Sequence, residues 1–210
     1  MTEIVVDVAT AIPDDTVAIG LPVVSGPDGP TLLVPSGFDR PDGSGGAEGL
    51  DAAWLRRQGF TAKPGQVFAF RDPTGGPVRW LLGLGGADSV DAERWRKASA
   101  ALVRSAGEGG TAVVVLPADP PGGAAAEIAA AVAEGAVLAA YRFGRRSDPK
   151  PPPVDRVALV AAAAGPAGSG PDDGLVVGAR RGARTARAVT FARDLVNTPA
   201  SELTPRRLAE

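Results

Sequence analysis

The sequence predicts an α/β fold with a three-layer arrangement, in which a mixed sheet is flanked by helices. Short apolar runs rich in β-branched residues recur along the chain, as in Val17–Val24 and Arg156–Ala161. Segments with apolar residues at helical spacing alternate with such runs in the second half, as in Asp91–Ala106 and Ala124–Tyr141. This alternation is typical of a largely parallel sheet that is covered on both faces.

Each further element follows from a local pattern. We expect strands where apolar runs are bounded by turn residues, at Ile4–Val8, Thr31–Val34, Gln66–Arg71, Val78–Leu82 and Ala112–Leu116. The Pro- and Gly-containing segment Asp72–Pro77 predicts a hairpin between Gln66–Arg71 and Val78–Leu82. A short helix is expected over Leu50–Gln58, and a long one over Leu175–Val196, which contains no Pro.

The composition is that of an ordinary globular chain, and it excludes several kinds of site. The formal net charge of −2 gives no indication of a nucleic acid or an anionic membrane as partner. Cys and His are both absent, so disulfides, thiol catalysis, His-based triads and HExxH zinc sites are impossible within these residues. No apolar run approaches the ~20 residues that cross a bilayer, and the start does not look like a signal peptide. We therefore expect a cytoplasmic protein without a membrane partner.

A glycine cluster, Gly83–Gly86, lies between an expected strand and an expected helix, where phosphate-binding loops occur. The pattern is incomplete, because Asp88 stands at the third glycine position and its charge would repel a phosphate. We favour the alternative, a tight turn in which Asp88 or Ser89 caps the following helix. A nucleotide-binding hypothesis stays open beside it, with Gly43–Gly49 as another candidate phosphate loop.

Basic residues on the expected long helix suggest a second kind of site. They fall on one side of it and comprise Arg180, Arg181, Arg184 and Arg187. Another basic group precedes it and comprises Arg142, Arg145, Arg146 and Lys150. Such a surface could contact a phosphate backbone, which would make DNA a partner. A solvated or subunit-interface helix face is the more ordinary interpretation, and we favour it.

The remaining candidates have structural interpretations. The acidic pairs Asp14–Asp15 and Asp172–Asp173 lack neighbouring carboxylates, so turn chemistry explains them better than metal binding. Ser25 and Ser36 have no accompanying base, so neither indicates a nucleophile elbow. Packing in or near the core is the expected role of Trp54, Trp80 and Trp95. The sequence therefore nominates no catalytic, cofactor-binding or metal-binding residue.

The most specific motif lies in the segment from Phe191 to Glu210. It contains Ala192-Arg-Asp-Leu-Val-Asn-Thr-Pro-Ala-Ser-Glu-Leu-Thr-Pro205. This run resembles the stretch that joins the two domains of leucyl (cytosol) aminopeptidases, roughly Ala-Arg-Asp-Leu-Val-Asn-x-Pro-x-Asn-x-Leu-x-Pro. One position departs from that pattern, because Ser201 stands where the family commonly has Asn.

Two earlier stretches resemble the N-terminal domain of the same family and occur in the family's order. One is Trp80–Gly86 followed by Asp91–Ala98. The other is Ala133–Phe143, which is similar to the family's Glu-Gly-x-x-Leu-x-x-Tyr-x-Phe. The resemblance implies that the N-terminal domain is α/β, like a macro domain, and carries no catalytic residues. It also implies a hexameric peptide hydrolase, whose two divalent metals, Mn or Zn, lie in a following catalytic domain.

The expected organisation follows from this resemblance. Residues 1–165 would form the non-catalytic N-terminal domain, residues 166–197 a loop and an interdomain helix, and residues 198–210 the start of a catalytic domain. The expected partners are the chain's own catalytic domain, other copies in the hexamer and a peptide substrate that loses its N-terminal residue, often leucine. The chain alone should be inactive, with a role in assembly and active-site access. The alternative is a stand-alone, macro-like module that binds ADP-ribose or a nucleotide.

Overall fold

The computed structural model describes residues 4–34, 51–71, 75–143, 152–162 and 172–206. The strands in these segments are β1 (Val5–Ala9), β2 (Thr16–Gly26), β3 (Gly29–Leu32), β4 (Val67–Phe70), β5 (Val78–Gly86), β6 (Thr111–Leu116) and β7 (Arg156–Ala161). The helices are α1 (Ala52–Arg57), α2 (Ala92–Ser105), α3 (Ala125–Ala140) and α4 (Asp173–Asn197), with a short 3₁₀ helix at Ala87–Ser89. The expected α/β class is therefore confirmed.

The strands form one mixed sheet in the order β1-β7-β6-β2-β5-β4, with β3 paired to β2. Neighbours from β1 to β5 along this order are parallel. The predicted hairpin is confirmed, because β4 and β5 pair antiparallel with Val67 opposite Leu82 and Phe70 opposite Arg79. The sheet is thus largely parallel with antiparallel additions, as the alternation of elements predicted.

A second hairpin was not predicted. The chain turns back after Gly26, and β3 begins at Gly29, where the backbone φ is +119°. Glycine adopts such a φ without steric cost, so pairing starts two residues before the expected strand Thr31–Val34. The expectation for this strand was correct in kind and wrong in its boundaries.

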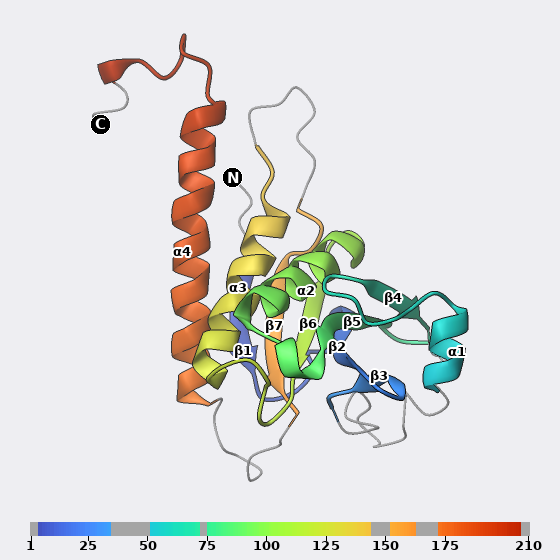
Figure 1. Cartoon of the computed structure of the whole chain (residues 1–210). Coiled ribbons are helices and arrows are strands. Elements are labelled where there is room, and N and C mark those ends of the chain that lie inside the picture. The colour runs from blue at the N-terminus through green and yellow to red at the C-terminus, as the bar shows by residue number, and fades with distance from the viewer. Residues whose placement is uncertain (1–3, 35–50, 72–74, 144–151, 163–171, 207–210) are drawn as a thin grey trace.

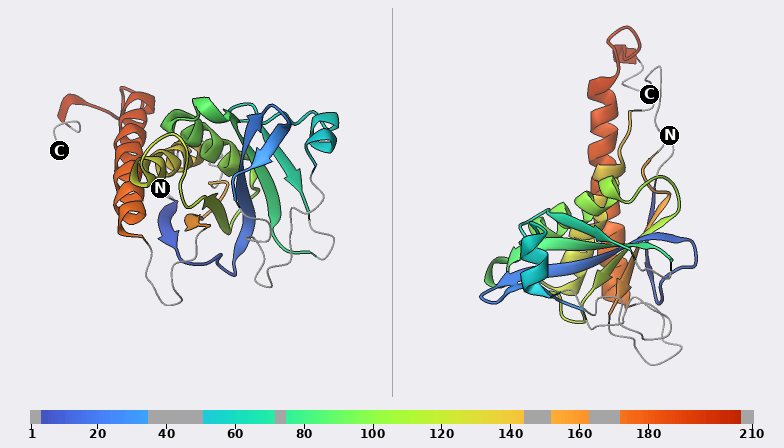
Figure 2. Two further views of the ribbon diagram at one scale, coloured as in Figure 1. Left: turned by 60° about the horizontal axis from the view of Figure 1, so that its bottom comes forward. Right: turned by 90° about the vertical axis from the view of Figure 1, so that its right-hand side faces the viewer.

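The two faces of the sheet carry separate cores, because successive side chains of a strand point to opposite faces. On one face, residues such as Leu82 and Val114 pack against α2, α3 and α4. On the other face, Leu81 and Val113 pack with Leu55 of α1. Figure 1 shows α3 lying between α2 and α4, and Figure 2 shows α4 projecting beyond the sheet. The three larger helices therefore cover one face of the sheet, and the short helix α1 packs on the other.

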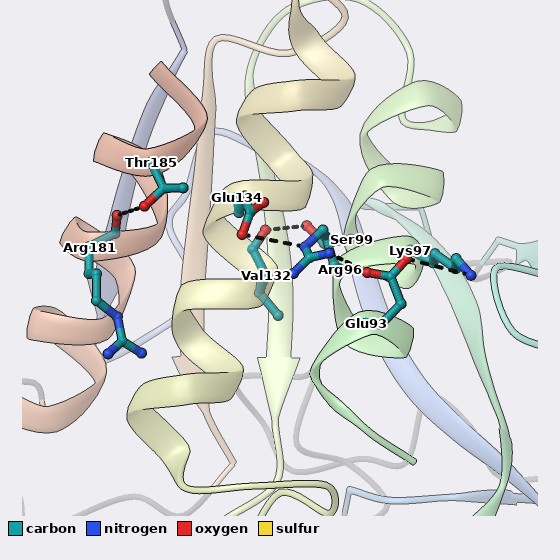
Figure 3. Close-up of polar contacts among 8 residues, drawn as sticks. All are labelled: Glu93, Arg96, Lys97, Ser99, Val132, Glu134, Arg181 and Thr185. Carbon is teal, nitrogen blue, oxygen red and sulfur yellow. Dashed lines mark hydrogen bonds and ion pairs between the residues drawn. The ribbon is translucent and has the colours of Figure 1, made fainter. Parts of the chain in front are cut away.

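Small residues bring the three larger helices close together. A Cβ at Gly135 would lie well inside 3.0 Å of the carbonyl oxygen of Arg96, so only glycine allows α3 to approach α2 so closely. Beside this contact, Ser99 Oγ donates to the carbonyl oxygen of Val132 at 2.8 Å, and the Arg96 guanidinium pairs with Glu134 (Figure 3). The close backbone approach, the buried hydrogen bond and the partly exposed ion pair hold α2 and α3 side by side.

No helix in the described part of the chain combines the length and the apolar character that crossing a bilayer requires.

Candidate functional site

The glycine cluster Gly83–Gly86 lies inside β5, so the tight turn expected there is wrong. The strand runs on to Gly86, and α2 begins only after Asp91, whose carboxylate accepts from the backbone N–H of Arg94 at 2.9 Å. Ser89, a predicted cap, instead donates its hydroxyl to the carbonyl oxygen of Gly86 at 3.0 Å. Local glycine content suggested a loop, whereas the parallel pairing of β5 with β2 keeps this stretch in the sheet.

These glycines serve a close approach of backbone to backbone. The segment after α1 passes across the strand, and the N–H of Gly85 donates to the carbonyl oxygen of Ala62 at 2.7 Å. A Cβ at Gly83 would overlap the carbonyl oxygen of Lys63, and Gly85 itself has a φ of +86°. The protein's own chain thus fills the space that a phosphate would need, which removes the support for a phosphate loop at Gly83–Gly86. The other candidate, Gly43–Gly49, lies outside the described residues.

The acidic pairs have structural roles. Asp15 accepts a hydrogen bond from Thr111 Oγ1 at 2.8 Å and so ties the start of β2 to β6. Asp172 caps α4, because its carboxylate accepts from the backbone N–H of Leu175 at 3.0 Å. The second pair is therefore a helix start rather than a turn. Within the described ranges, no group of three or more Asp, Glu, His or Cys side chains could hold a metal, so the metals implied by the resemblance find no donor set there.

The tryptophans pack in the cores, as predicted. Trp95 is fully buried and donates its Nε1–H to the carbonyl oxygen of Pro121 at 2.9 Å. The ring of Trp54 meets Phe68 edge to face, with 5.6 Å between the ring centroids. Trp80 is half-buried against the core beneath α2–α4. Of the two candidate nucleophiles, Ser25 lies near the end of β2, and Ser36 falls outside the described residues.

The arginine-bearing side of α4 is exposed, as expected for a solvated or interface face. Arg180, Arg181 and Arg184 face away from the buried side of the helix. Beside them, Thr185 Oγ1 donates to the carbonyl oxygen of Arg181 at 3.2 Å, a contact within the helix (Figure 3). Of the second basic group, Arg142 donates to the carbonyl oxygens of Ala139 and Tyr141, and the others lie outside the described residues. Contact with a phosphate backbone stays the untested alternative to a solvated or interface face.

A polar cluster joins the ends of α3 and α4. The Tyr141 hydroxyl, directly after α3, donates to Asp194 Oδ1 at 2.8 Å and accepts from Asn197 Nδ2 at 3.3 Å. The Arg193 guanidinium lies 5.5 Å from the centroid of the tyrosine ring, within range of a cation–π contact. Burial, and then the hydrogen bond to Asp194, raise the pKa of Tyr141 above its ordinary value of 10.0. We call these four residues the Tyr141 clamp.

The Tyr141 clamp brings together two of the stretches that carry the resemblance. Tyr141 is the tyrosine of the Ala133–Phe143 stretch, and its partners belong to the Ala192–Pro205 run. The two stretches are more than fifty residues apart in the chain, so no local pattern in the sequence links them. The signal that could have linked them was chemical: each supplies polar groups at the end of an expected helix.

Comparisons with known proteins give a consistent result. The model of the cytosol aminopeptidase family, N-terminal domain, matches residues 44–149. A probable cytosol aminopeptidase from Rhodococcus opacus is 34% identical over 205 residues, which cover 93% of this chain and 36% of that protein. One from Streptomyces avermitilis is 30% identical over 218 residues, covering 96% of this chain and 40% of that protein. The chain thus spans little more than a third of the length of such relatives.

Solved structures agree. The bottromycin maturation enzyme BotP is similar with a TM-score of 0.66 and 34% identity, over 92% of this chain and 35% of that one. A mutant of tomato leucine aminopeptidase is similar with a TM-score of 0.66 and 21% identity, over 99% of this chain and 41% of that one. The second likeness, at this low identity, concerns the fold alone.

Proposed function

This chain belongs to the cytosol aminopeptidase family, whose N-terminal domain it contains, and we propose that it is the non-catalytic part of a metal-dependent leucyl aminopeptidase. One observation carries the proposal. The match to the N-terminal domain extends over residues 44–149, while the chain spans only 36% of the Rhodococcus opacus relative. The chemistry of such a protein would then belong to the part of the relative that this chain does not match.

The proposal assigns a role to each part of the chain. Residues 1–165 form the N-terminal domain, residues 166–197 a loop and the interdomain helix, and residues 198–210 the start of the catalytic domain. The projection of α4 beyond the sheet supports an interdomain role for this helix (Figure 2). A new helical turn that begins at Pro205, after the break at Thr198–Thr204, supports a change of structural unit there. The first half of α4 also packs on α3, so the linker is anchored on the domain.

The complete enzyme would remove N-terminal residues, often leucine, from peptides in the cytoplasm. Two divalent metals, Mn or Zn, would polarise the peptide carbonyl and activate water when bound in the catalytic domain. The described residues of this chain provide no donor set for them, so its own part is to support that domain. We propose that it does so by stabilising a hexamer and by shaping access to the active site.

An activity assay tests this proposal. The 210-residue chain is incubated with leucine p-nitroanilide and Mn²⁺, beside the same chain extended by the catalytic portion of the Rhodococcus opacus relative. We expect turnover from the extended protein and none from the chain alone. Robust turnover by the chain alone would contradict a non-catalytic role.

A third protein, the catalytic portion without this chain, separates assembly from chemistry. We expect it to be less active than the extended protein and to form smaller assemblies, as measured by light scattering after size-exclusion chromatography. Equal activity and equal assembly size with and without this chain would remove the supporting role that we propose.

A further inference from the structure

Helix α4 is held in two ways along its length. Its first half buries a stripe of small and apolar side chains on the domain, ending at Ala186. In the described chain beyond Ala186, up to residue 206, no residue is buried, and Phe191 and Val196 are 63% and 84% exposed. Apolar burial therefore does not hold the second half directly, and its direction depends on the packed first half of the same helix and on contacts near its end.

The Tyr141 clamp is positioned to set that direction. Asp194 and Asn197 lie three positions apart, so both face the same side of α4 and both reach one hydroxyl. Arg193 adds its guanidinium to the ring of that tyrosine. Tyr141 itself directly follows the last residue of α3, which packs against α2 and against the sheet. The hydroxyl thus connects a projecting helix end to a fixed part of the domain.

We propose that Tyr141 is a positioning residue, whose hydroxyl fixes the angle at which the second half of α4 leaves the domain. At 1.5 Å per residue, the stretch from Ala186 to Asn197 is about 16 Å long, so a change in tilt of about 10° would move its end by about 3 Å. Displacements of ~1 Å at an active site can lower rates about 100-fold. If α4 is the interdomain linker of the proposed function, the clamp sets the placement of the catalytic domain.

The clamp can be tested in the 210-residue chain without any assay of catalysis. Because the chain contains no cysteine, two introduced cysteines provide the only thiols for spin labels. Arg104→Cys on α2 and Val196→Cys near the end of α4 place both labels at exposed positions. The measurement is the distribution of label–label distances by pulsed electron paramagnetic resonance. We expect Tyr141→Phe, which keeps the ring and removes the hydroxyl, to broaden and shift this distribution.

A second label pair is the matched control. Arg104→Cys with Val177→Cys reports on the first half of α4, where Val177 is 64% exposed and the opposite side is packed. We expect Tyr141→Phe to leave this distribution unchanged. Asp194→Ala should broaden the 104–196 distribution as well, and Asp194→Asn should largely preserve it, because its amide oxygen still accepts a hydrogen bond.

Two results would overturn the proposal. The first is a 104–196 distribution that keeps its width in both Tyr141→Phe and Asp194→Ala. The second is equal broadening of both label pairs, because that would show a general loosening of α4 rather than loss of a local angle. Neither result depends on the proposed function, which the activity assay addresses separately. If the activity assay contradicts the proposed function, the clamp would still fix the direction of the second half of α4. It would then no longer be expected to set the placement of a catalytic domain.

Discussion

The two halves of α4 show two different ways of attaching a helix to a domain. The backbone of the first half packs directly on α3. A Cβ at Gly178 or Gly182 would overlap the carbonyl oxygens of Ala126 and Ala130, so only glycine allows this approach. The second half is exposed and is attached through the Tyr141 clamp. Packing spread over several turns resists both tilting and sliding. A polar contact centred on one hydroxyl fixes an angle while contributing little to global stability.

Removing an apolar anchor of the first half should have the largest effect. Leu175 is 5% exposed, so Leu175→Ala should lower the free energy of unfolding by about 2–5 kcal/mol through lost burial and a cavity. Val196→Ala, at an exposed position of the second half, should change it by less than about 0.5 kcal/mol. Urea denaturation followed by circular dichroism measures both. Equal effects would show that the two halves are attached alike.

Adding a methyl group to the tightest contact should come next. Gly182→Ala places a Cβ against the carbonyl oxygen of Ala130, a backbone atom that cannot move aside cheaply. Overpacking costs about 1–3 kcal/mol and outweighs the gain of up to about 1 kcal/mol in helix propensity. Arg181→Ala, at the adjacent exposed position, is the control in the same denaturation experiment. A more stable Gly182→Ala variant would contradict the close packing of α3 and α4.

Loss of the helix cap should have a smaller effect. Asp172→Ala leaves the N–H of Leu175 without its acceptor and should cost about 1 kcal/mol. Asp172→Asn should cost much less, because an asparagine cap accepts the same hydrogen bond. Thermal unfolding of the two variants separates a capping role from a role of the charge. A larger loss for the asparagine variant than for the alanine variant would be inconsistent with capping.

A rise in pH should have the smallest effect on stability, and it acts on the Tyr141 clamp of the second half. The fold raises the pKa of Tyr141, so it favours the protonated phenol. The contribution of the clamp is then fully present below the ordinary pKa of 10.0 and is lost as the pH rises through the raised pKa. The chain has a single tyrosine, so ultraviolet absorbance of the phenolate follows this residue alone.

We expect the midpoint of that titration to lie above 10.0 and to fall in Asp194→Ala, which removes both the hydrogen bond and the nearby negative charge. The 104–196 label distribution should broaden over the same pH range, and the 104–177 distribution should not. A midpoint at or below 10.0 in the unsubstituted chain would contradict the hydrogen bond from Tyr141 to Asp194.

Much of the fold was predictable from local patterns. The strand Arg156–Ala161 was predicted with its observed bounds. The helix expected over Asp91–Ala106 is observed as Ala92–Ser105, and the two end residues of the expected range are its caps. These elements are long, regular in their hydrophobic spacing and bounded by residues with clear turn or cap chemistry. The family resemblance was likewise carried by a contiguous run, Ala192–Pro205, which can be recognised in the sequence when the fold is not known.

The contacts between segments that are far apart in the sequence could not be predicted from local patterns. Gly83–Gly86 resembles a loop in sequence and is a strand in the fold, because pairing with β2 and the approach of Ala62–Gly65 require glycine there. The glycines at 178 and 182 lower helix propensity and are nevertheless where α4 meets α3. Patterns in the sequence indicated most of the helices and strands and the family that the chain resembles. Only the folded chain decided which backbones touch and that Tyr141 meets Asp194, because both depend on contacts between segments far apart in sequence.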